Sequence, residues 1–62
     1  MALFSDITGA EEIIRQVKNG DFPNRNTAYR FLVEIVNQFR GQPIADEAEY
    51  LINTYYTDQK YR

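Results

Sequence analysis

The sequence predicts an all-α fold, a small three-helix bundle in which the second helix is central. Apolar residues recur at intervals of three and four along three segments, which is the spacing of amphipathic helices. Residues that favour helix starts and ends separate these segments, and no alternating apolar and polar run continues past four positions. We therefore expect no strand. A chain of 62 residues is predicted to form one domain, residues 1–62.

The first helix is expected over residues 9–19, after a lead-in segment of residues 1–7. Thr8 and Glu11 match a capping box, in which each side chain bonds the other residue's backbone N–H. Gly20 predicts the end of this helix, because glycine readily adopts a positive φ angle after the last helical turn. Three apolar residues of the lead-in segment are expected to fold back onto the core: Leu3, Phe4 and Ile7.

The second helix is expected over residues 25–40, ending before Gly41. At about 100° per residue its apolar side covers more than half of the circumference, whereas an ordinary surface helix has a stripe of roughly 100°. Other helices must therefore cover it from two directions, which makes it the central helix. Three residues are equally acceptable as its N-cap: Asn24, Asn26 and Thr27.

The third helix is expected over residues 43–57, with Pro43 in its first turn, where a missing N–H is harmless. The short connection to the second helix predicts antiparallel or steeply crossed neighbours. Residues 58–62 are expected to be a frayed tail. The three helices together predict the core: Ile13, Ile14, Val17, Phe31, Leu32, Ile35, Val36, Phe39, Ile44, Ala48, Leu51, Ile52 and Tyr55.

The composition argues against an enzyme. The chain has no cysteine and no histidine, which removes disulfides, thiolate zinc sites and the commonest general base. Asp46, Glu47 and Glu49 are the only acidic cluster of interest as a metal site. Asp46 and Glu49 lie about 60° apart on a helix, Glu47 points elsewhere and no ligand loop follows, so we interpret the cluster as an acidic helix start. We expect no catalytic residue, metal, cofactor or small-molecule substrate.

The charge pattern argues against nucleic-acid binding as the main function, but it leaves one alternative. The net charge is −2. The second and third helices resemble a helix-turn-helix in outline, yet the third carries acids where phosphates would repel them. A nucleic-acid-associated regulator would have to use the basic residues of the second helix and its approaches: Arg25, Arg30 and Arg40. No apolar run approaches the roughly 18 residues of a membrane span and no signal peptide is evident, so we expect a cytoplasmic protein without membrane contact.

The remaining class is a module for protein–protein interaction or regulation. Tyr50 lies on the polar side of the third helix, beside carboxylates and amides, and tyrosine offers a large contact area with few torsions to order. The third helix is acidic, which suits a basic partner protein or a second copy of the chain in a homodimer. The candidate protein-binding residues are Asp46, Glu47, Glu49, Tyr50, Asn53 and Tyr56. The alternative interpretation, without a binding role, is that Tyr50 covers a terminal segment or is simply solvated.

Overall fold

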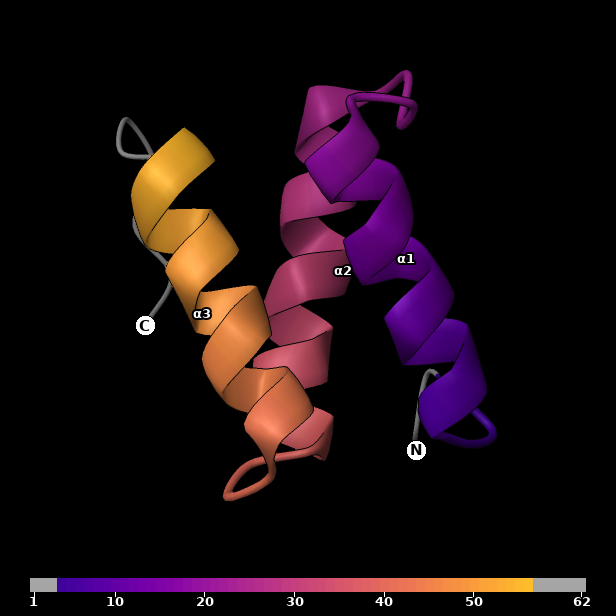
Figure 1. Ribbon diagram of the computed structural model, residues 1–62, viewed down its shortest axis with the longest axis vertical. Coiled ribbons are helices and arrows are strands. Elements are labelled where there is room, and N and C mark those ends of the chain that lie inside the picture. The colour runs from indigo at the N-terminus through magenta and orange to yellow at the C-terminus, as the bar shows by residue number, and fades with distance from the viewer. Residues whose placement is uncertain (1–3, 57–62) are drawn as a thin grey trace.

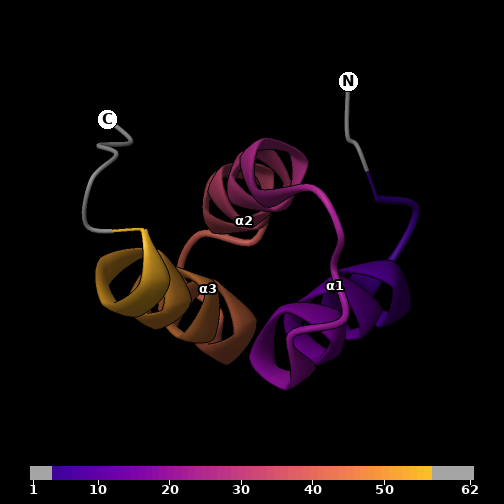
Figure 2. The same cartoon turned by 90° about the horizontal axis from the view of Figure 1, so that it is seen from above.

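The computed structural model describes residues 4–56 and contains three helices in that range: α1 (Ile7–Asn19), α2 (Arg25–Gln38) and α3 (Pro43–Tyr55). They run up, down and up, so that α2 is antiparallel to the other two (Figure 1). Seen along the bundle, the helices occupy the corners of a triangle (Figure 2). α2 contacts both α1 and α3, as the sequence predicts for a central helix, and α1 also contacts α3.

α1 begins two residues earlier than predicted because a different residue caps it. Asp6 has an extended backbone, and its carboxylate accepts a hydrogen bond from the Thr8 backbone N–H at 3.0 Å. Asp6 therefore fills the N-cap position, Thr8 lies inside the helix, and the predicted capping box is wrong. The predicted end is confirmed, because Gly20 has a φ angle of +76° and its N–H bonds the carbonyls of Gln16 and Val17.

Asn24 caps α2, since its side-chain oxygen accepts from the backbone N–H of Thr27 at 3.0 Å. α2 ends at Gln38, two residues before the predicted end, and Gly41 supports the turn to α3 with a φ angle of +90°. Pro43 opens α3 as predicted, and α3 also ends two residues early, at Tyr55.

One apolar core lies between the three helices. Its largest fully buried side chains are Leu32 and Ile35 of α2 with Leu51 and Ile52 of α3. Three predicted core residues, Ile13, Val17 and Phe31, are only half-buried at its edge. The prediction is wrong for Tyr55, which is 52% exposed. The rest of the predicted core is confirmed as buried: Ile14, Leu32, Ile35, Val36, Phe39, Ile44, Ala48, Leu51 and Ile52.

Aromatic side chains attach the segments outside the helices to this core. The Phe4 ring lies 6.0 Å from that of Phe31 and 6.3 Å from that of Phe39, so the predicted fold-back of Phe4 is confirmed. Phe22, in the loop after α1, meets Phe31 edge-on at 5.8 Å. Ile7 begins α1 and is 37% exposed, so the predictions that it belongs to the lead-in segment and folds back onto the core are wrong. Leu3 and the predicted tail, residues 58–62, lie outside the described residues.

Candidate protein-binding face on α3

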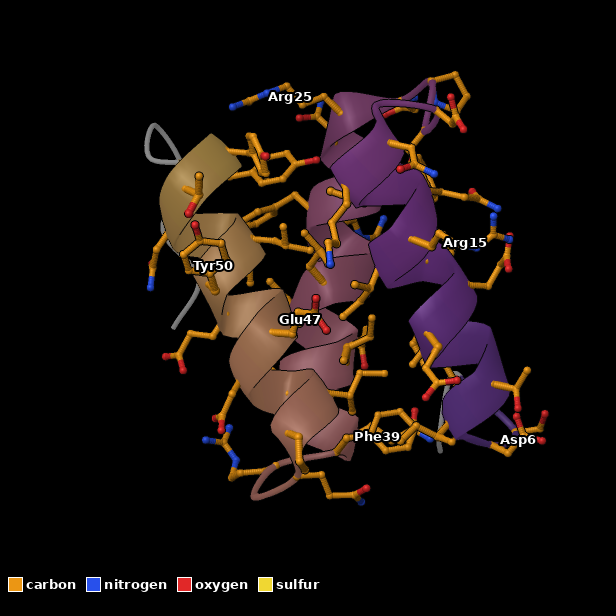
Figure 3. All side chains as sticks on the ribbon, in the orientation of Figure 1. Asp6, Arg15, Arg25, Phe39, Glu47 and Tyr50 are labelled. Carbon is orange, nitrogen blue, oxygen red and sulfur yellow. The ribbon has the colours of Figure 1, made fainter. Side chains whose placement is uncertain are left out.

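α3 has two sides of opposite character. Its apolar side is buried against the other helices. On the opposite side, Asp46, Tyr50 and Asn53 follow one another at spacings of four and three residues, and all three are exposed. Tyr50 is 65% exposed, more than any other large hydrophobic side chain among residues 4–56, and it points away from the bundle (Figure 3). We call the exposed residues the α3 face: Asp46, Glu47, Glu49, Tyr50 and Asn53.

Glu47 lies at the edge of the α3 face nearest to α1 (Figure 3). Its carboxylate accepts a hydrogen bond from the Lys18 ammonium of α1 at 2.8 Å, and both side chains are about half exposed. This hydrogen bond, and then the negative charge of Glu47, raises the pKa of Lys18 above its ordinary value. Glu47 therefore has a contact within the bundle, whereas Asp46 and Tyr50 have room to meet a partner.

The Glu47→Gln variant should lower the pKa of Lys18, because it removes the charge that stabilises the ammonium. Because the pKa of Lys18 is raised in the folded protein, its contact with Glu47 stabilises the fold fully at pH values below the unfolded pKa of about 10.4. This stabilisation is lost as the pH rises through the folded pKa. An NMR titration of the Lys18 side chain measures the shift, with Glu34→Gln on α2 as the control. Equal Lys18 pKa values in the three proteins would contradict the ion pair.

Tyr56 does not belong to the α3 face, so this predicted site residue is corrected. It is 6% exposed, its ring centroid lies 5.7 Å from that of Tyr29, and the Arg25 guanidinium lies 4.6 Å above its ring. Burial raises the pKa of the Tyr56 hydroxyl, while the charge of Arg25 acts in the opposite direction. α3 ends at Tyr55, and Tyr56 leaves helical geometry with a φ angle of −128° and a ψ angle of 43°, which turns its ring inward.

The three arginines of the alternative site are not gathered into one patch. Arg25 donates a hydrogen bond to the carbonyl of Tyr55 at 2.7 Å, so it caps the C-terminal end of α3 as well as covering Tyr56. Arg40 donates to the Asn37 side chain at 3.0 Å. Arg30 is exposed on α2. Arg25 begins α2 and Arg40 follows its end, so the two lie at opposite ends of a helix about 20 Å long at 1.5 Å per residue.

Shallow grooves flank α1 on the described part of the chain, and two of them bear on the site. One, of about 340 Å³, lies between α1 and α3 over Ile14 and Ile44 and is bordered by Lys18 and Glu47. The other, of about 440 Å³, lies at the end of the bundle where Phe22, Pro23 and Tyr55 meet. Within residues 4–56 no three acidic side chains come close enough together to hold a metal ion. In the same range no helix has the length and apolar character needed to cross a membrane.

Sequence reasoning missed one arrangement near the start of the chain. Gln38, on α2, bonds both backbone groups of Phe4. The available signal was a spacing of seven residues between Phe31 and Gln38, which places both on one side of α2. The partner, 34 residues away in sequence, could not be identified from that spacing.

Fold and face together define a small three-helix domain with a polar, tyrosine-bearing surface. Comparisons with protein families, with curated proteins and with solved structures found no match.

Proposed function

We propose that this protein is a non-catalytic interaction or regulatory module that binds another protein through the α3 face. The observation that supports this most is Tyr50. It presents 65% of its surface to solvent in the middle of a helix whose apolar residues are otherwise in the core or at the helix end. The fold makes little use of this ring, and an exposed tyrosine between polar groups is a common anchor at protein interfaces.

The charge around Tyr50 specifies the chemistry of the partner. α3 carries Asp46, Glu47 and Glu49 and no lysine or arginine over Pro43–Tyr55. A complementary surface would be basic and would offer an apolar or cationic spot for the tyrosine ring. In this proposal the partner is a basic protein or a second copy of the chain forming a homodimer, and the protein acts in the cytoplasm.

The nucleic-acid alternative receives less support from the geometry. It depends on Arg25, Arg30 and Arg40, and Arg25 is already engaged with Tyr55 and Tyr56 of its own chain. No observation on the described residues favours this function over protein binding.

The Tyr50→Ala and Asp46→Lys variants should lose binding while keeping the fold. For Tyr50→Ala we expect the melting temperature to change by less than about 4 °C, because surface substitutions usually change stability by less than about 0.5 kcal/mol. Asp46→Lys also reverses a charge in the first turn of α3, so we expect it to lose roughly a further 0.3–1 kcal/mol of stability through the helix dipole. Affinity for the partner should fall about fivefold or more, since truncating an interface anchor costs more than about 1 kcal/mol. Wild-type protein captures the partner from cell extract, and the purified partner is then titrated against each variant.

Two matched controls make this result specific. Tyr55→Ala removes a tyrosine that is 52% exposed but lies outside the α3 face, and Glu34→Lys makes the same charge change on α2. Both should bind as the wild type does. Equal affinity of Tyr50→Ala and Tyr55→Ala for the partner would reject the α3 face. Light scattering over a concentration series at two salt concentrations shows whether the partner is a second copy, in which case a dimer weakens as salt rises.

A further inference from the structure

The segment before α1 is held by a contact that resembles the recognition of a peptide. The backbone N–H of Phe4 donates to the side-chain oxygen of Gln38 at 3.1 Å, and the Gln38 side-chain N–H donates back to the Phe4 carbonyl at 2.7 Å. A glutamine amide has a donor and an acceptor in one plane, as a peptide group has. Gln38 therefore satisfies both backbone groups of one residue, a contact that does not depend on that residue's side chain.

The ring of the same residue lies against the rings of Phe31 and Phe39, and we call the position that it fills the aromatic pocket. The Phe4 ring is tilted by 51° against Phe31 and by 40° against Phe39, at centroid distances within the favourable range for aromatic pairs. Gly9 of α1 completes the pocket, because a Cβ atom there would lie 3.2 Å from the Phe4 ring. Gln38 thus binds the backbone, whereas the pocket favours an aromatic ring. Phe39 and Asp6 lie at the same end of the bundle (Figure 3).

Phe4 occupies this pocket as a short segment rather than as part of a helix. It is only partly buried, and the exposed Ser5 and Asp6 connect it to the first turn of α1. Two hydrogen bonds and the packing of one ring hold this segment, so the free energy needed to detach it is lower than that needed to unfold the helices. Opening would leave Gln38 and the pocket free.

We propose that this pocket binds an extended segment of a partner protein that carries an aromatic residue, and that Phe4 fills it in the free protein as an internal competitor. The pocket is formed by Gly9, Phe31, Gln38 and Phe39, and it is separate from the α3 face. The partner's aromatic ring replaces that of Phe4, and its backbone N–H and carbonyl take the two bonds of Gln38. Apparent affinity is reduced by the fraction of molecules in which Phe4 occupies the pocket.

The test uses the full chain and a defined probe, an acetylated and amidated pentapeptide with the sequence of residues 2–6. It is titrated into the wild type and the Phe4→Ala variant while NMR follows the side-chain amide of Gln38 and the backbone amides of Phe31 and Phe39. Phe4→Ala should bind the peptide about tenfold or more tightly than the wild type does, because its internal competitor is weakened. The Phe4→Ala variant should bind a peptide with alanine in place of phenylalanine about tenfold more weakly than it binds the original peptide. The Phe4→Ala, Gln38→Met double variant should bind the original peptide about tenfold more weakly than Phe4→Ala does.

Several results would overturn the proposal. They are equal binding of the two peptides, equal binding by wild type and Phe4→Ala, or no saturable shift of Gln38 up to about 5 mM peptide. If Phe4→Ala loses its native NMR spectrum, Phe4→Leu takes its place, because leucine keeps more of the side-chain volume. The same results would then support or overturn the proposal. A wild-type dimer that Phe4→Ala abolishes would show exchange of this segment between copies, which would also overturn it. None of these results depends on Tyr50 or the α3 face.

Discussion

The Leu32→Ala variant should lose about 2–5 kcal/mol of unfolding free energy, the range measured when a large aliphatic side chain is removed from a packed core. Leu32 is 0% exposed, and it lies on α2, which contacts both other helices. The cavity would therefore open at the centre of the bundle, where no single helix can move in to fill it. A domain of this size has a total stability of roughly 3–9 kcal/mol, so the expected loss is a large fraction of it. Urea denaturation followed by circular dichroism measures the loss.

Val33→Ala is the matched control for Leu32→Ala. Val33 is the next residue on α2, is only half-buried and borders the core. Because this substitution removes fewer buried atoms than Leu32→Ala does, we expect the unfolding free energy to fall by less than about 1.5 kcal/mol. If Leu32→Ala costs less than 1 kcal/mol, or no more than Val33→Ala does, then α2 is not the central helix and the proposed core is wrong.

The positions of the three helices could be predicted because burial in a bundle imposes the helical period on the sequence. Leu32 and Ile35 of α2, Phe39 directly after it, and Ile44, Ala48 and Leu51 of α3 all follow that period and are all buried. Helix ends were less accurate: the start of α1 depends on which of two polar residues caps its first turn, and α2 and α3 each end two residues before the predicted position. Asp6 and Thr8 are both acceptable N-caps, and Asp6 takes this role in the structure.

The candidate site was predictable only in part. The helical period placed Asp46, Tyr50 and Asn53 opposite the core, and the structure exposes all three. That they bind a partner stays a prediction. The contact of Glu47 with Lys18, and that of Arg25 with Tyr55, join residues 29 and 30 positions apart, and no local pattern encodes such a distance. They depend on how the helices pack, which the sequence alone leaves open.

The pair Tyr55 and Tyr56 shows where periodicity fails. The period assigns Tyr55 to the core because it assumes that α3 continues, but Tyr55 is the last helical residue and lies at the open end of the bundle. Once the chain leaves helical geometry at Tyr56, the rotation of about 100° per residue no longer applies. The next ring then turns inward, against Tyr29 and beneath Arg25.

Tyr56→Ala should therefore cost about 3–5 kcal/mol, as the removal of a large buried aromatic side chain does, whereas Tyr55→Ala should cost less than about 1 kcal/mol. The loss at Tyr56 has two sources. The ring is 6% exposed and packs on Tyr29, and its removal also takes away the surface on which the Arg25 guanidinium lies. Tyr56→Phe separates the hydroxyl from the ring and should retain most of the stability, because the packing and the cation–π contact both belong to the ring. Urea denaturation of the three variants measures which of the two tyrosine rings belongs to the core. A larger loss for Tyr55→Ala than for Tyr56→Ala would mean that α3 continues past Tyr55 and that Tyr56 returns to the surface beside the α3 face.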